Sequence, residues 1–148
     1  MNQELEVKIK KLHPNAVIPS YSKPGDAGLD ITAVSVETDE YGNYVYATGL
    51  SFEIPEGYYM QLTPRSSNHK TGLYLTNHCG IVDSGYRGEV YFKYKQVQAG
   101  LAWHLPVYKV GERIGQAVIL PYPKVRFTEV EELSETERGA GGYGSTGN

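Results

Sequence analysis

The sequence predicts an all-β domain, a sandwich or barrel built from short antiparallel strands. Two observations support this fold class. Apolar residues recur at every second position in several short runs, which is the period of a half-buried strand. The chain also holds 17 Gly, 8 Pro and 13 Tyr in 148 residues, a composition that favours strands and tight turns over helices. Many short strands with few helices are typical of such folds.

In the first half of the chain, strands are predicted at residues 5–9, 29–36, 44–47, 50–54 and 58–62. In the second of these strands the alternation slips by one position at Ala33 and Val34, which predicts an irregularity there. The polar residues 38–43 predict a turn that reverses the chain. Three prolines between residues 13 and 25 predict an extended surface segment.

In the second half, strands are predicted at residues 73–76, 89–97 and 117–120, with a last one around Val125 and Phe127. Glycines within residues 80–91 predict that the first two strands form a hairpin. Residues 66–70 predict one short helical turn capped by a serine. Residues 98–110 are expected to be loop and strand. The continuous apolar run at 117–120 predicts a strand buried on both faces.

The chain length predicts one domain with a terminal arm. At 148 residues the chain can bury most of its apolar surface without disulfides. Residues 129–137 hold five glutamates, and the residues that follow are almost entirely Gly, Ser and Thr. Such a segment cannot pack against itself and should move until it closes on something. We therefore predict a β-barrel domain at 1–137 and a flexible C-terminal arm at 138–148 that closes over another part of the protein.

Charge and composition exclude several classes of protein. The formal net charge is −3, and no basic tract is present, which argues against nucleic-acid binding. A single cysteine, Cys79, cannot form an intramolecular disulfide. No apolar run approaches the length of a membrane span, and no apolar segment follows the first Met. We expect a cytoplasmic protein with no membrane partner.

Two features of the central segment and of the arginines point to a site. Asp83, Tyr86 and Arg87 lie together in the predicted hairpin, and after two apolar residues we expect the Asp83 carboxylate to be held by structure. Taken alone, this segment is better explained as an ordinary hairpin turn. However, four of the five arginines lie in stretches that contain glycine or serine, where guanidinium and backbone N–H groups can approach one oxyanion. This arrangement is typical of polyphosphate binding.

Five stretches of the chain resemble the five ordered motifs of the trimeric dUTPase family. They are PGDAGLDI at 24–31, PRSS at 64–67, the segment from Asn77 through GIVDSGYRGE at 77–89, GERIGQ at 111–116 and RGAGGYGSTG at 138–147. The chain departs from the family at Ser67, where Gly is frequent, at Gly115, where Ala is usual, and at Tyr143, where Phe is more frequent. Each motif is weak alone, but five in this order make coincidence very improbable.

The resemblance implies a jelly-roll-like β-barrel assembled as a homotrimer, with active sites at the subunit interfaces. It implies hydrolysis of dUTP to dUMP and pyrophosphate by attack of water at the α-phosphorus, with Mg²⁺ as the cofactor. This reaction limits uracil incorporation into DNA and supplies dUMP for dTMP synthesis. Asp83 corresponds to the general base of the family. A fixed carboxylate suits this role because it can take a proton from water.

The resemblance also implies the contacts with the substrate. Tyr86 would lie against the sugar and select deoxyribose, and Asn77 would pair with uracil together with the backbone of Gly80, Ile81 and Val82. The remaining predicted substrate-binding residues are Arg65, Ser66, Ser67, Tyr91, Gln116, Arg138, Tyr143, Gly144, Ser145 and Thr146. Arg113 is equally well explained as a phosphate ligand or as a structural ion-pair partner. Asp30 is expected to hold a metal-bound water, with Mg²⁺ held mainly by the triphosphate.

Two other functions remain open at this point. A dCTP deaminase of the same fold is one, although the glycine-rich tail and the YRGE sequence favour the hydrolase. A binding module that keeps the fold without catalysis is the other, and the intact motifs argue against it. Release of pyrophosphate or ammonia from dUTP and dCTP separates the three.

Overall fold

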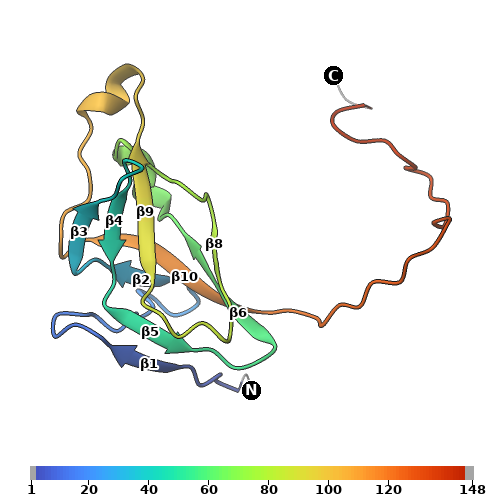
Figure 1. Cartoon of the computed structure of the whole chain (residues 1–148), viewed down its shortest axis with the longest axis horizontal. Helices are drawn as coiled ribbons and strands as arrows, with labels where there is room; N and C mark the ends of the chain where they lie inside the picture. Colours follow the sequence, from blue (N-terminus) through green and yellow to red (C-terminus); the bar gives the residue numbers. More distant parts are fainter. Residues whose placement is uncertain (1–2, 146–148) are drawn as a thin grey trace.

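The fold was examined in a computed structural model that describes residues 3–145 (Figure 1). Within these residues, the strands and two 3₁₀ helices follow one another in the order β1 (Lys8–Lys11), β2 (Leu29–Thr32), β3 (Ser35–Thr38), β4 (Tyr44–Ala47), β5 (Leu50–Glu53), β6 (Tyr58–Thr63), η1 (Ser66–Lys70), β7 (Leu73–Leu75), β8 (Gly80–Val82), β9 (Tyr91–Gln96), η2 (Gly100–His104) and β10 (Arg113–Pro121). The all-β prediction is confirmed.

Two four-stranded sheets form the body. One has the strand order β2-β10-β6-β8, and the other has the order β3-β4-β9-β7, while β1 and β5 form a separate pair. Every pairing is antiparallel. The buried apolar side chains come from both larger sheets and from β5, so the core lies between them. This arrangement agrees with the jelly-roll-like barrel that the family resemblance implies.

The predicted irregularity at Ala33 and Val34 is confirmed, and it is the point at which the chain changes sheets. The Ala33 N–H donates to Glu112 O at 3.1 Å, and the Val34 N–H donates to Ala47 O at 2.8 Å. Neighbouring residues therefore bond to opposite sheets. The single predicted strand at 29–36 is in fact two strands, β2 and β3.

The prediction of one central hairpin was only partly right. The strands β7 and β9 do pair, with Leu75 opposite Tyr94. Residues 80–82 between them, however, form β8, which pairs with β6 in the other sheet, with Gly80 opposite Leu62. A Cβ atom on Gly80 would lie 3.2 Å from that of Leu62, so this close approach favours glycine. The crossing begins at His78, which has a φ of 63° in the left-handed region.

The helix predictions need two corrections. The helical turn at 66–70 exists, but its cap residue is Arg65, with no side-chain capping bond among the described residues, and not a serine. Residues 98–110 contain the second 3₁₀ helix, η2, and no strand. Figure 1 shows η2 as a lobe that projects beyond the end of β9.

Three buried tyrosines form the centre of the core beside η1. The rings of Tyr46 and Tyr94 pack edge to face with their centroids 5.9 Å apart. The ring centroid of Tyr108 lies 6.1 Å from that of Tyr46 and 5.5 Å from that of Tyr94. The Tyr46 hydroxyl donates to Tyr108 O at 2.7 Å, and that of Tyr94 donates to Ile114 O at 2.6 Å. Burial raises the pKa of Tyr46 to about 12, so its hydroxyl stays protonated and can donate.

The last predicted strand, around Val125 and Phe127, is wrong for the single chain. After β10 the Tyr122 N–H donates to Gly57 O at 3.0 Å, and the chain then runs away from the body (Figure 1). The exposed fractions of Val125 and Phe127 are 63% and 94%. The chain itself offers no neighbouring strand here, so the alternation finds no pairing partner. The predicted domain boundary at residue 137 stays a prediction.

The run at 117–120 lies in β10, but only Ala117 is buried, and Val118, Ile119 and Leu120 are half-buried in the single chain. The prediction of burial on both faces was therefore wrong for one copy. No helix among residues 3–145 is both long and apolar enough to cross a membrane.

Gly115 gives a test of how closely the two sheets pack. It is buried in β10, and a Cβ atom at this position would overlap the ring of Phe92 in β9. We predict that Gly115→Ala lowers the free energy of unfolding by about 1–3 kcal/mol, the usual cost of overpacking a core. The change in the free energy of unfolding is measured by urea denaturation of the wild type and the variant.

The double variant Gly115→Ala/Phe92→Leu makes this test specific. Its loss of stability should be smaller than the sum of the two single losses, because the smaller side chain gives the methyl group room. Additive losses would show that the Phe92 ring is not what Gly115 accommodates.

Candidate active site

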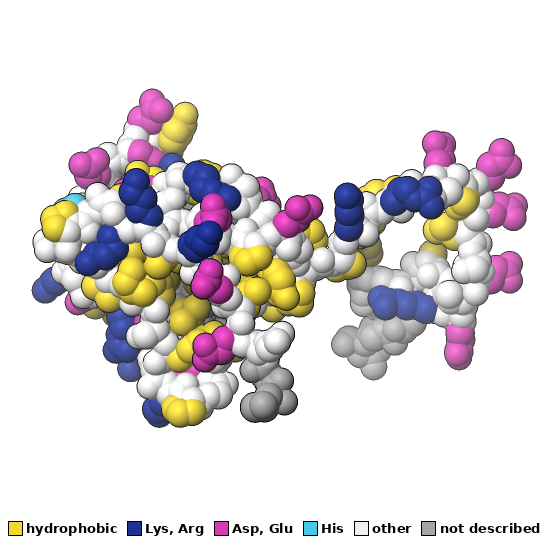
Figure 2. Space-filling model, turned by 90° about the horizontal axis from the view of Figure 1, so that it is seen from below, with side chains coloured by type: hydrophobic (Ala, Val, Ile, Leu, Met, Phe, Trp, Pro, Cys, Tyr) yellow, Lys and Arg dark blue, Asp and Glu magenta, His cyan; other side chains and the backbone are white. Residues whose placement is uncertain are grey.

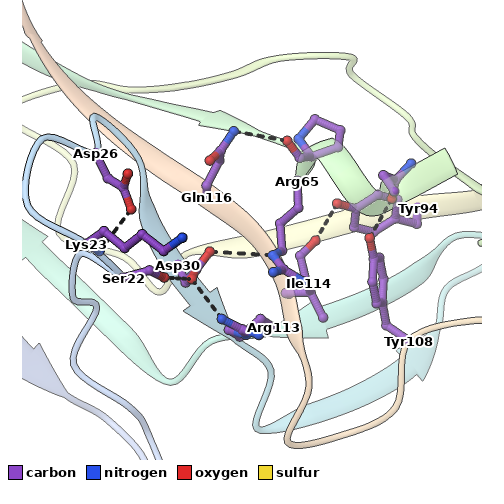
Figure 3. Close-up of polar contacts among 12 residues, drawn as sticks. Ser22, Lys23, Asp26, Asp30, Arg65, Tyr94, Tyr108, Arg113, Ile114 and Gln116 are labelled. Carbon is purple, nitrogen blue, oxygen red and sulfur yellow. Dashed lines mark hydrogen bonds and ion pairs between the residues drawn. The ribbon is translucent and has the colours of Figure 1, made fainter. Parts of the chain in front are cut away.

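Asp30 is the centre of a polar cluster on the sheet that contains β2 and β10 (Figure 3). One carboxylate oxygen lies 3.5 Å from Arg65 Nε, and the other lies 3.2 Å from Arg113 Nη1. The Ser22 hydroxyl donates to the second oxygen at 2.9 Å. The Asp30 side chain is 22% exposed, so these partners hold the charge of a largely buried carboxylate.

This cluster decides the role of Arg113 in the single chain, where it is an ion-pair partner of Asp30. It also contains Ser22, which the sequence reasoning missed. Ser22 lies in the proline-rich extended segment, and only the structure shows that its hydroxyl reaches Asp30. Two guanidinium groups on one carboxylate leave an excess positive charge, which suits an anionic ligand.

The predicted phosphate turn follows β6 and lies beside this cluster. Gln116 lies opposite Asp30 in the β10–β2 pairing, and its side-chain amide donates to Pro64 O at 3.4 Å. A Cβ atom on Gly28 would overlap this amide, so the glycine in the first motif makes room for Gln116. The predicted residues Asp30, Arg65 and Gln116 are thus brought together, with Ser66 and Ser67 next to them in η1.

The predicted base-binding segment lies at the edge of the same sheet. Asn77 is exposed in the turn before β8, and its carbonyl accepts a hydrogen bond from Cys79 N at 2.6 Å. Gly80, Ile81 and Val82 pair with β6 on one side. No strand of the described chain pairs with their other side. This open edge presents backbone groups to which a flat polar ring can hydrogen-bond.

Asp83 and Tyr86 follow β8. Asp83 is exposed in the single chain, so the expectation that structure holds its carboxylate was wrong here. The Tyr86 hydroxyl donates to Glu89 O at 2.8 Å, and its ring packs over Gly88. The Tyr86 ring is 45% exposed, which excludes a core tyrosine in one copy. Arg87 contacts Glu53 at 3.4 Å and is an ion-pair partner.

Asp83 and the phosphate turn lie far apart within one chain. Val82, the residue before Asp83, is opposite Met60, and Arg65 comes five residues after Met60. A strand rises about 3.3 Å per residue, so the backbones of Asp83 and Arg65 are separated by on the order of 15–20 Å. At this separation the Asp83 carboxylate and the Arg65 guanidinium of the same chain are not in direct contact.

Tyr91 lies near neither the predicted phosphate turn nor the predicted base-binding segment. It lies opposite Ala47 in the β4–β9 pairing and lines a hollow of about 270 Å³ with Glu37 and Glu89. No other predicted substrate-binding residue is among the residues that line this hollow. The assignment of Tyr91 as a substrate-binding residue stays a prediction.

The C-terminal arm contacts no other predicted site residue in the described chain. Arg138 Nε donates to Gly141 O at 2.9 Å, within the arm itself. Tyr143 is fully exposed, with a φ of 54°, and Gly144 has a φ of 78°. Ser145 N donates to Gly142 O at 3.0 Å. Thr146 lies outside the described residues.

A protein-only metal site is not found in the part of the chain that is described. No group of three or more His, Cys, Asp or Glu side chains gathers there.

Comparisons with known proteins identify the family. A family model described as dUTPase matches residues 14–147. The deoxyuridine 5'-triphosphate nucleotidohydrolase of Wolinella succinogenes is 42% identical over 147 residues, covering 98% of this chain and 96% of that protein. The enzyme of the same name from Nautilia profundicola is 43% identical over 145 residues, covering 97% and 99%.

Solved structures agree with this result. The Staphylococcus bacteriophage 80alpha dUTPase with dUPNHPP has a TM-score of 0.79 and 30% identity, covering 97% of this chain and 99% of its own. A variant of the dUTPase of phage phi11 of S. aureus, described with a structural Mg(II) ion, has a TM-score of 0.70 and 26% identity, covering 86% and 98%. With both the family model and near full-length relatives in agreement, the chain belongs to the dUTPase family.

Proposed function

We propose that this chain hydrolyses dUTP to dUMP and pyrophosphate by attack of water at the α-phosphorus, with Asp83 as the general base. Family membership supports dUTP hydrolysis. The observation that carries the more detailed proposal is the separation of Asp83 from the Asp30–Arg65–Arg113 cluster. The motif residues are present but do not all come together in one copy, which supports an active site built from more than one copy.

The proposed assembly is a homotrimer with its active sites between subunits. One subunit contributes the base-binding edge, with Asn77, β8, Asp83 and Tyr86. Another contributes the phosphate turn and the Asp30 cluster. Closed rings of identical subunits repeat one heterologous contact, so three such sites arise from one interface.

An apolar groove and the C-terminal arm support the same assembly. The groove, of about 610 Å³, lies between β1 and the sheet that holds β6 and β10, and Ile9, Phe52 and Ile119 are among its lining residues. Figure 2 shows hydrophobic side chains on the body up to the point where the chain leaves it after β10, and both acidic and basic side chains along the extended segment that follows. We propose that the exposed Val125 and Phe127 lie on a neighbouring subunit, which would place Arg138 and Tyr143 near its site.

The residues have distinct roles in this mechanism. Uracil pairs with Asn77 and the open backbone edge of β8, and the ring of Tyr86 lies against the deoxyribose. Arg65 and the turn that follows it bind the phosphates, and Arg138 from the arm binds the terminal phosphate. Asp83 takes a proton from the attacking water. Positive groups around the triphosphate stabilise the charge of the transition state, which is the main source of rate in phosphoryl chemistry.

Mg²⁺ fits this site through the substrate more than through the protein. An ionised carboxylate offers about four lone-pair positions. Ser22 and Arg113 hydrogen-bond to one oxygen of Asp30, and Arg65 lies in ion-pair contact with the other at 3.5 Å. Asp30 can therefore accept one further bond from a metal-bound water, whereas direct coordination would compete with two guanidinium groups. When bound, Mg²⁺ would neutralise phosphate charge.

The biological consequences form part of the proposal. Removal of dUTP limits uracil incorporation into DNA, and the product dUMP supplies dTMP synthesis. A cytoplasmic location suits this role. The function is tested by release of pyrophosphate from dUTP, whereas ammonia release from dCTP would indicate a deaminase instead.

The first prediction concerns the general base. Asp83→Asn should keep the fold and the binding of dUPNHPP, and it should lower kcat by about 10²–10⁴-fold, the usual contribution of a positioned base. The measurement is steady-state pyrophosphate release, with circular dichroism as the control of folding. Turnover near that of the wild type would remove Asp83 from the mechanism.

The second prediction concerns the choice of sugar. The Tyr86 ring is fixed by its bond to Glu89 O and is half exposed, so it can fill the space of a 2′-hydroxyl. Tyr86→Ala should lower kcat/KM for dUTP and raise the ratio of UTP to dUTP use. Tyr74→Ala, another exposed tyrosine, is the matched control. An unchanged ratio would mean that the ring does not select the sugar.

The third prediction tests the shared site. Asp83→Asn with an intact arm, and a chain that ends at Glu137 with Asp83 intact, should each form nearly inactive trimers. The two are mixed in equal amounts, unfolded and refolded together. About a quarter of the sites should then receive both intact parts by random assembly of a closed ring.

The outcome of mixing separates two arrangements. Activity far above that of both parents supports base and arm from different subunits. If both parts came from the same chain, no site could be intact. Absence of recovered activity in trimers proven to be mixed by mass spectrometry would therefore contradict the shared site.

A further inference from the structure

The turn that follows Arg65 is organised around Asn68. The Asn68 N–H donates to Arg65 O at 2.9 Å, and its carbonyl accepts from the N–H and the hydroxyl of Thr71, at 2.9 and 2.7 Å. Its side-chain amide donates to Leu73 O at 2.9 Å. A short 3₁₀ helix has poor hydrogen-bond geometry of its own. The conformation of η1 therefore depends on how firmly Asn68 is held.

The remaining polar atom of that side chain is held by Tyr108. The Tyr108 hydroxyl donates to Asn68 Oδ1 at 2.7 Å, and the two residues are 40 positions apart in the sequence. Tyr108 is 8% exposed, its ring packs edge to face on Tyr46 and Tyr94, and its carbonyl accepts the Tyr46 hydroxyl. Because the core fixes both the ring and the backbone, the core also fixes the position of this hydroxyl.

The hydroxyl of Tyr108 also lies within the electrostatic reach of the phosphate turn. Burial raises the pKa of Tyr108, and the positive charge of Arg65 opposes that rise. A raised pKa keeps the hydroxyl protonated at neutral pH, so it remains a donor to Asn68.

The other end of the turn is held independently. Arg65 pairs with Asp30 at 3.5 Å, and Gln116 donates to Pro64 O at 3.4 Å. Ser66 and Ser67 thus lie between two anchors, one formed by residues on β2 and β10 and one formed by the tyrosine core. An anchored turn loses less conformational entropy when it binds phosphate than a free one.

We propose that Tyr108 is a positioning residue for the triphosphate, which acts through Asn68 to hold Arg65, Ser66 and Ser67 in their binding conformation. This inference rests on the proposed function of the turn. It assigns a role to the segment between β9 and β10, which the proposed mechanism otherwise leaves unused. It also limits that role to the phosphate end of the substrate, because Asn77, β8 and Tyr86 have no part in this network.

The test is Tyr108→Phe, which removes the hydroxyl and keeps the ring. The Kd for dUPNHPP should rise about 5- to 20-fold, as expected when a largely buried acceptor loses its partner. The Kd for dUMP, which carries the base, the sugar and one phosphate, should change much less. In turnover, KM for dUTP should rise with kcat largely kept, the result of losing uniform binding.

Two further variants separate positioning from general stability. Thr48→Val removes another buried hydroxyl that donates to a carbonyl, Val90 O at 2.7 Å, away from the turn. It should lower the melting temperature without changing the ratio of the two Kd values. Asn68→Leu should raise the Kd for dUPNHPP, and adding Tyr108→Phe to it should raise that Kd no further, because the hydroxyl has lost the residue it acts through.

The outcomes are distinct. Suppose that the wild type binds both ligands, and that Tyr108→Phe weakens the binding of both equally or of neither. The inference is then overturned and the proposed function stands. Additive effects of Tyr108→Phe and Asn68→Leu also overturn it. A wild type that binds neither ligand overturns the proposed function and this inference with it. If Tyr108→Phe fails to fold, Asn68→Leu alone must show the selective loss of dUPNHPP binding.

Discussion

The arrangement of the candidate site depends on one largely buried carboxylate, that of Asp30. A buried charge is costly unless it is paired, and Asp30 is paired with Arg65 and Arg113. These partners come from separate motifs, and they meet only because β10 lies between β2 and β6 in the sheet. Removing the carboxylate would leave two like charges side by side. The same excess of positive charge, held in place, is what a triphosphate requires.

That strand order has a second consequence. With β2 at one edge and β8 at the other, Asp30 and the predicted base-binding segment lie at opposite edges of one sheet. In the proposed assembly, the open edge of β8 reads the base of a nucleotide whose phosphates bind to a different copy of the chain. The exposed carboxylate of Asp83 and the undocked arm agree with this view, because both should find their partners in the assembly.

Most strands could be predicted because their alternation records burial within the chain, as at Phe92 and Tyr94 in β9. The strand around Val125 and Phe127 could not be placed correctly, since its alternation finds no partner in one copy. The three residues of β8 are too short to show a period, so their transfer to the other sheet was invisible. The site residues were predictable as local motifs. Contacts such as Arg113 with Asp30, 83 residues apart, follow only from the topology.

The tyrosines of the core show why packing and function are connected in this fold. A buried hydroxyl costs stability unless it donates, and two of the three find backbone carbonyls within the barrel. The third, on Tyr108, donates to a side chain in the turn that follows β6. Phenylalanine would fill the same space, but it could not transmit the position of the core to that turn. The rigidity of the barrel interior therefore extends to the turn that we propose binds phosphate, whereas the arm and the open edge of β8 have no such anchor in the described chain.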